Sequence, residues 1–140
     1  MIRNLIVMFL FAINLLGCAQ VTMQNYSSTP VNLNQRMVQD AGGQLVVMYP
    51  PAHTAFYIQP PAHDSFVVSL IAGLRKKGYS VDESTLRGTR NAIALHYVVD
   101  KSNKSSMYHI ILLVGKQSIS RAYHFKNGTL TPLGFWVRKE

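Results

Sequence analysis

The stretch that best defines the fold is DSFVVSLIAGLRKKG, residues 64–78. Asp64 is a residue type that caps helix N-termini. The basic residues 75–77 favour the C-terminal end of a helix, which is the negative end of its dipole. Gly78 can adopt the left-handed conformation that often ends a helix. The apolar residues between them recur at the spacing of one helical face: Phe66, Val67, Leu70, Ile71 and Leu74. These features predict an amphipathic helix that begins after Asp64 and ends before Gly78.

Downstream of this helix, the apolar pattern changes to a period of two. The apolar content of residues 107–114 predicts burial on both faces, whereas Pro132 predicts an edge strand or a bulge. Asn127-Gly128 is a strong signal for a two-residue hairpin. The expected strands are 79–83, 92–99, 107–114, 118–125 and 129–137.

Upstream, residues 34–48 place apolar side chains near one helical face and predict a further helix, although Gly42 and Gly43 lie inside it. It must end before Pro50, because residues that precede proline avoid helical angles. A short strand is expected over 54–58. The order of elements predicts an α+β fold, with two helices packed on one face of a mostly antiparallel sheet. It argues against a doubly wound nucleotide-binding fold.

The composition fits one modest domain. The chain has 140 residues and a formal net charge of +8, from 14 Lys+Arg against 6 Asp+Glu. Because the basic residues are scattered over turns and alternate strand positions, the sequence does not indicate a nucleic-acid interface. The single cysteine, Cys18, excludes an intramolecular disulfide and a thiolate zinc cluster.

The first 17 residues have the features of a signal peptide. They carry one charge, Arg3, and an apolar run that is too short to span a membrane. The end of this segment, LLGC at 15–18, resembles a bacterial lipobox, with cleavage between Gly17 and Cys18. The resemblance implies a diacylglycerol and an N-acyl chain on Cys18, and two or more chains anchor a protein stably. The alternative is an ordinary signal peptide with an incidental cysteine.

The lipobox interpretation divides the chain into three parts: a lipoprotein signal peptide (1–17), a lipid-anchored tether (18–33) and a periplasmic α+β domain (34–140). The tether is mostly polar, contains Pro30 and lacks a helical or alternating pattern. Fully extended, it reaches about 50 Å. Ala19 stands where an aspartate often retains lipoproteins in the inner membrane, so outer-membrane sorting is expected.

The histidines do not form a recognisable catalytic or metal-binding motif. None has a nearby serine or aspartate in a nucleophile setting, so we expect no enzymatic activity. His109 and His124 can lie diagonally on one face of a three-stranded meander. His53 and His63 lack further ligands at a suitable spacing, so no metal is expected, and the only expected cofactor is the lipid on Cys18.

Several blocks between residues 44 and 140 resemble one known family. They are MYPPA at 48–52, AGLRKKGY at 72–79, and the more specific GKQSISRAY at 115–123 and WVRKE at 136–140. The family is the conjugal transfer lipoprotein TrbH. The resemblance implies an outer-membrane lipoprotein, facing the periplasm, that supports assembly or stability of a conjugative type IV secretion channel.

That role requires a surface that binds other envelope components of the apparatus. We expect an exposed sheet edge that is open to strand addition, together with the aromatic and basic segment 135–138. The expected partner-binding residues are Arg121, Tyr123, Phe135, Trp136 and Arg138. Trp136 fits the core equally well. Two alternatives remain: a free-standing envelope lipoprotein that binds a glycan or an anionic lipid, and a periplasmic enzyme.

Overall fold

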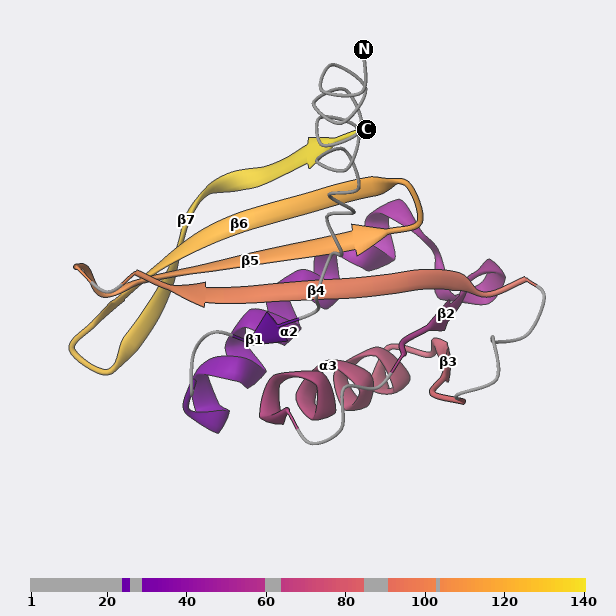
Figure 1. Cartoon of the computed structure of the whole chain (residues 1–140), viewed down its shortest axis with the longest axis horizontal. Helices are drawn as coiled ribbons and strands as arrows, with labels where there is room; N and C mark the ends of the chain where they lie inside the picture. Colours follow the sequence, from indigo (N-terminus) through magenta and orange to yellow (C-terminus); the bar gives the residue numbers. More distant parts are fainter. Residues whose placement is uncertain (1–23, 26–28, 60–63, 85–90, 103) are drawn as a thin grey trace, which may run out of the picture.

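The structure is a computed structural model that describes residues 24–25, 29–59, 64–84, 91–102 and 104–140. The helices are α2 (Val31–Met48), α3 (Ser65–Lys76) and the short 3-10 helix η2 (Pro51–His53). The strands are β1 (Gln24–Asn25), β2 (Ala55–Tyr57), β3 (Ser80–Asp82), β4 (Ile93–Lys101), β5 (Met107–Val114), β6 (Gln117–Lys126) and β7 (Thr129–Lys139). Figure 1 shows them arranged as one sheet with the helices beside it.

The sheet has the strand order β3-β2-β4-β5-β6-β7, and β1 pairs with β4. Strands β4 to β7 form an antiparallel meander with long ladders. Strand β2 pairs in parallel with β3 and β4, and β1 pairs in parallel with β4. Helix α3 is the crossover between β2 and β3. The predicted α+β class with a mostly antiparallel sheet is confirmed. The parallel pairs were not predicted, because strands of two or three residues carry no readable periodicity.

One face of the sheet is covered by both helices, as predicted. Alternate residues of β4, β5 and β6 are buried there: Leu95, Tyr97, Val99, Tyr108, Ile110, Leu112, Val114, Ile119 and Tyr123. The helices contribute Leu33, Met37, Val38, Ala41, Leu45, Phe66, Val67, Leu70, Ile71 and Leu74. The expectation that β5 is buried on both faces is wrong. Met107 and His109 are exposed, because neither α2 nor α3 covers the other face.

Helix α3 matches its sequence pattern closely. The side chain of Asp64 accepts a hydrogen bond from the Phe66 amide at 2.8 Å, so it caps the helix as predicted. The second carboxylate oxygen of Asp64 accepts from the Tyr97 hydroxyl at 2.6 Å, which ties the cap to β4. Gly78 adopts a φ of 91°, a left-handed conformation that glycine tolerates best.

Helix α2 begins three residues before the predicted start at residue 34. The carbonyl of Pro30 accepts hydrogen bonds from the amides of Leu33 and Asn34, so residues 31–33 belong to the helix rather than to the tether. Proline suits this position, because its fixed φ is compatible with a helix start. The helix continues through Gly42 and Gly43 and ends at Met48, before Pro50. The alkyl chain of Lys77 lies close over Gly42, where a Cβ would collide with it.

The edge strand β7 carries the irregularity that Pro132 predicts. Ala122 pairs with Leu133 and Ser120 pairs with Val137, so three residues of β7 lie opposite Arg121 alone. At this bulge Gly134 has a φ of 60°. Leu130 is the one buried residue of the strand. Figure 1 shows β7, in yellow, as the outermost strand.

Candidate functional site

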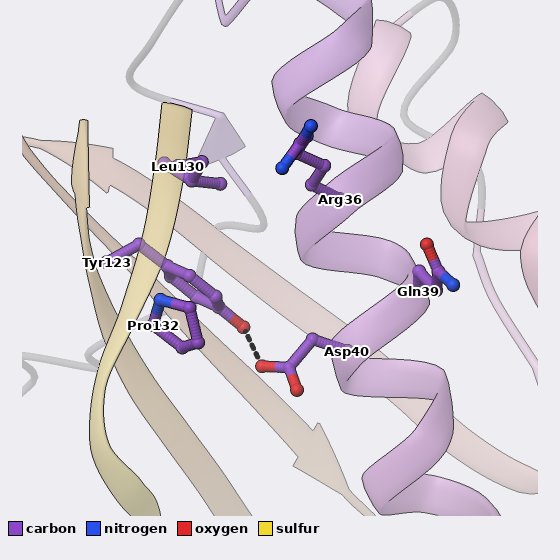
Figure 2. A pocket seen from close by; sticks show the side chains of 6 residues that line it. All are labelled: Arg36, Gln39, Asp40, Tyr123, Leu130 and Pro132. Atoms are coloured by element: carbon purple, nitrogen blue, oxygen red, sulfur yellow. Dashed lines mark hydrogen bonds between the residues drawn. The ribbon is translucent and has the colours of Figure 1, made fainter. Parts of the chain in front are cut away.

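A carboxylate on α2 joins that helix to β6. The Nη1 atom of Arg121 donates to both carboxylate oxygens of Asp40 at 3.0 Å. The hydroxyl of Tyr123 donates to Asp40 Oδ2 at 2.7 Å, the bond dashed in Figure 2. Residues 121 and 123 of β6 therefore converge on one acidic residue more than 80 positions earlier in the chain. We call Asp40, Arg121 and Tyr123 the clamp.

The clamp is partly shielded from water, which strengthens its hydrogen bonds. The side chains of Arg121 and Asp40 are 16% and 31% exposed, and Tyr123 is buried. Burial, and then the hydrogen bond to Asp40, raises the pKa of the Tyr123 hydroxyl well above its ordinary value. Tyr123 is therefore a neutral donor at any physiological pH. Both oxygens of Asp40 accept hydrogen bonds, so this carboxylate is not free to act as a general base.

The guanidinium of Arg121 also connects β6 to β7. Its Nη2 atom donates to the main-chain oxygen of Gly134 at 2.7 Å, inside the bulge. Its central carbon lies 6.0 Å from the centre of the Trp136 ring, within the range of a cation–π contact. Trp136 itself is half-buried and packs against the core. Arg121 thus holds the irregular part of β7 in place.

An open pocket lies beside the clamp, between α2 and β7. It has a volume of about 350 Å³ and is lined by Arg36, Gln39, Asp40, Tyr123, Leu130 and Pro132. Figure 2 shows Leu130 and Pro132 on the strand, with Arg36 and Asp40 on the helix opposite and Gln39 on the far side of that helix. Because Asp40 and Tyr123 are bound to one another, the pocket offers no nucleophile with an adjacent free base.

Beyond the clamp, β7 presents apolar side chains to solvent. Leu133 is 40% exposed, Phe135 is 91% exposed and Val137 is 63% exposed. We call these three residues the β7 patch. Leu133 and Val137 lie opposite Ala122 and Ser120, so they are on the sheet face that the helices leave uncovered. None of the three is needed to complete the core.

The structure separates the sequence-predicted partner-binding residues into two groups. Phe135 and Arg138 are exposed, and Arg138 forms a surface ion pair with Glu140 at 2.6 Å. Arg121, Tyr123 and Trp136 instead lie at the junction between α2, β6 and β7. Gly17 and Cys18 lie outside the described residues.

Two elements of the site were missed by sequence reasoning. The first is Asp40, whose available signal is that it is the single acidic residue of α2, next to the core position Ala41. The second is the exposure of Leu133 and Val137. Alternation along a strand shows that two residues share a face, but it does not show whether that face is covered.

The structure places His109 and His124 on neighbouring strands. His109 lies opposite Ala122 and His124 lies opposite Met107, so the two histidines are diagonal neighbours as predicted. Within the described ranges, no group of three or more His, Cys, Asp or Glu residues could hold a metal ion. His63 lies outside those ranges. None of the helices in the described part of the chain is long and apolar enough to cross a membrane.

Comparison with known proteins gives one match. The family model for conjugal transfer protein TrbH matches residues 19–140, which include both helices, the clamp and the β7 patch. No curated protein and no solved structure matches the chain. Because the family match covers most of the sequence, the chain belongs to the TrbH family of conjugal transfer proteins.

Proposed function

We propose that this protein is an outer-membrane lipoprotein, anchored through Cys18, that supports a conjugative type IV secretion channel through protein contacts. The observation that carries the proposal is the β7 patch. A phenylalanine that is 91% exposed contributes little to the core, and the neighbouring Arg121 keeps its strand in a defined conformation. Exposed apolar clusters with polar surroundings are typical of interaction sites.

The clamp gives this surface its rigidity. An interaction surface that is ordered before binding loses less conformational entropy when a partner arrives. Arg121 contacts Asp40 on the helix, Gly134 in the bulge and Trp136 on the same strand. In this proposal Arg121, Tyr123 and Trp136 act by positioning β7, while Phe135 and Arg138 contact the partner.

The proposed anchor holds the domain near the membrane. Gln24 and Asn25 pair with Val98 and Val99 of β4, so in this proposal residues 18–23 link the lipid to the first paired residue. Such a segment reaches about 20 Å when fully extended. The domain would therefore lie closer to the outer membrane than the whole segment 18–33 would allow.

Replacement of the anchoring residue tests the proposal directly. We expect Cys18→Ser to remove lipid labelling, to release the protein from the outer-membrane fraction and to lower plasmid transfer to the level of a gene deletion. Ala19→Ser is the matched control, since it alters a neighbouring residue and leaves the acylated thiol in place. An unlabelled wild-type protein, or normal transfer by the Cys18→Ser variant, would contradict the proposal.

The alternative of a free-standing lipoprotein predicts a different result. The net charge of +8 is compatible with binding to an anionic lipid surface, and salt weakens such binding. That alternative gains support if deletion of the gene leaves transfer unchanged while the protein binds vesicles that contain phosphatidylglycerol. A periplasmic enzyme would instead show turnover that His109→Ala or His124→Ala abolishes.

A further inference from the structure

The open side of β7 is a poor template for another strand. Pro132 has no amide hydrogen, and prolines within sheets occur where that position faces away from the ladder. The bulge at Gly134 interrupts the strand, and the Gly134 oxygen is taken by Arg121. Arg138 and Lys139 add charge near the end of the strand. Proline, bulges and charged residues are the features by which proteins prevent pairing between sheet edges.

The side chains of β7, in contrast to its main chain, form a surface that favours binding. Leu133, Phe135 and Val137 are all exposed and apolar, and they follow one another at intervals of two residues. Val137 and Leu133 extend the patch onto the helix-free sheet face, next to Ser120 and Ala122. The strand therefore offers an apolar surface for insertion into a pocket, while Pro132 and the bulge make its main chain a poor template for pairing.

Positive charge surrounds this patch. Lys139 lies two residues beyond Val137 on the same face, and Lys116 is in the turn before β6, whose residue Ser118 pairs with Lys139. Lys126 is exposed at the other end of the β6–β7 hairpin. A binding partner with carboxylates around an apolar pocket would complement this arrangement.

A second copy of the chain is a poor source of those carboxylates. The six acidic residues all fall within the described ranges. Five of them accept hydrogen bonds inside the chain: Asp40 in the clamp, Asp64 at the helix cap, Asp82 from the Ser84 amide, Glu83 from Arg75 and Glu140 from Arg138. Asp100, at the far end of β4, is the remaining one. Two like copies would thus bring together two basic rims.

We propose that the β7 patch inserts its side chains into an apolar pocket, rimmed by carboxylates, on a different protein. This inference rests on the proposed function and specifies its partner: a heterologous envelope protein, bound through side chains rather than by strand addition. Phe135 is the anchor, because large aromatic side chains in a pocket dominate binding energy. Lys116, Lys126 and Lys139 meet the acidic rim.

Site-specific photo-crosslinking in cells that carry out plasmid transfer tests the identity of the partner. Benzoylphenylalanine replaces Phe135 in the full chain, and the same residue at Val68 on α3 is the matched position on another face. We expect a protein adduct from position 135 at least tenfold stronger than from 68. Mass spectrometry is expected to place the crosslink beside acidic residues of a different polypeptide. An adduct between two copies of this chain, or a lipid adduct without a protein adduct, would overturn the proposal.

Charge reversal tests the acidic rim. We expect the double variant Lys116→Glu, Lys139→Glu to lower the yield of the adduct about tenfold. Reversal of the partner's carboxylates at the mapped site should restore it. The matched control Arg36→Glu, Lys76→Glu changes the same number of exposed charges on the helical layer and should leave the yield unchanged. Equal yields from both double variants would overturn the proposed rim.

Side-chain truncation separates pocket insertion from strand addition. Strand addition uses main-chain hydrogen bonds, so it would tolerate Val137→Ser. Insertion predicts that Val137→Ser lowers the crosslink yield at least tenfold when the crosslinker is placed at Leu133. The matched control is Val68→Ser, which should leave the yield unchanged, because the 61% exposure of Val68 is close to the 63% exposure of Val137. An unchanged yield for Val137→Ser would contradict insertion. The proposed function fails separately, if transfer does not depend on Cys18.

Discussion

The strands at the two ends of the strand order, β3 and β7, are built in opposite ways. β3 has three residues and lies beside α3, whose residue Arg75 donates to the Val81 oxygen at 3.1 Å and pairs with Glu83 at 2.6 Å. β7 has eleven residues, of which only Leu130 is buried. In each case an arginine binds a main-chain oxygen of the edge strand, Val81 or Gly134.

The aromatic residues near the two strands differ in burial. Near β3, Phe56 is fully buried in the adjacent strand β2, with its ring 4.9 Å from Tyr79 and 6.3 Å from Tyr49. On β7, Phe135 is 91% exposed. The β3 edge therefore contributes its aromatic surroundings to the stability of the fold, whereas the β7 edge keeps an aromatic residue available to a partner.

The largest expected effect comes from removal of the aromatic ring near β3. Phe56→Ala leaves a cavity in a fully buried site, so we expect the free energy of unfolding to fall by about 3–5 kcal/mol. Urea unfolding of the full-length chain, followed by circular dichroism, measures this change. A loss below about 1 kcal/mol would mean that the β3 end of the sheet is not part of the cooperative core.

The clamp is the next target, because it connects β7 to the helical layer. Asp40→Asn removes the charge that Arg121 and Tyr123 share, and we expect a loss of about 2 kcal/mol in unfolding free energy. Glu140→Gln is the control, since it breaks an exposed ion pair and should cost at most about 0.5 kcal/mol. Equal losses in the two variants would show that the clamp is no stronger than a surface pair.

The raised pKa of Tyr123 predicts a pH dependence of stability. Above the ordinary value of 10.0 the unfolded chain releases this proton while the folded chain keeps it, so the free energy of unfolding falls as pH rises. Each such group contributes up to about 1.4 kcal/mol per pH unit. Between pH 9 and pH 11, Tyr123→Phe should therefore lose up to about 1.4 kcal/mol less stability than the wild type. Parallel pH profiles would contradict this role of the clamp.

The smallest effect on stability is expected at the β7 patch. Phe135→Ala should change the free energy of unfolding by less than about 0.5 kcal/mol, because the side chain is almost fully exposed. Plasmid transfer should nevertheless fall strongly, as the proposed partner loses its anchor. Urea unfolding and mating assays on the same variant give both values. Wild-type transfer, or a stability loss comparable to that of Phe56→Ala, would remove the contrast between the edges.

Local sequence signals predicted the elements that depend on local geometry. Asp64 and Gly78 mark the ends of α3 because capping and left-handed stops involve residues only a few positions apart. Asn127-Gly128 and Pro132 likewise predict the last hairpin and its irregular edge. The start of α2 was missed because Pro30 provides a backbone carbonyl rather than a capping side chain.

The candidate site was predicted only in part. Arg138 is on the surface as its residue type suggests, whereas Phe135 is exposed although phenylalanine is usually buried. The engagement of Arg121 and Tyr123 depends on Asp40, which is 81 positions from Arg121. No periodicity links residues at such a separation. The parallel pairing of β2 with β3 and β4 has the same origin, since it depends on how α3 returns the chain to the sheet.

Residue types and spacing alone predicted the α+β class, the capped helix α3, the hairpin strands and the edge position of β7. Each of these follows from contacts between near neighbours or from the restricted backbone of proline. Three-dimensional packing decided which faces the helices cover. It also placed Asp40 against Arg121 and Tyr123, and it left Leu133, Phe135 and Val137 in solvent. Exposure depends on what the rest of the chain covers, and α2 and α3 both pack on the opposite face of the sheet from Leu133 and Val137.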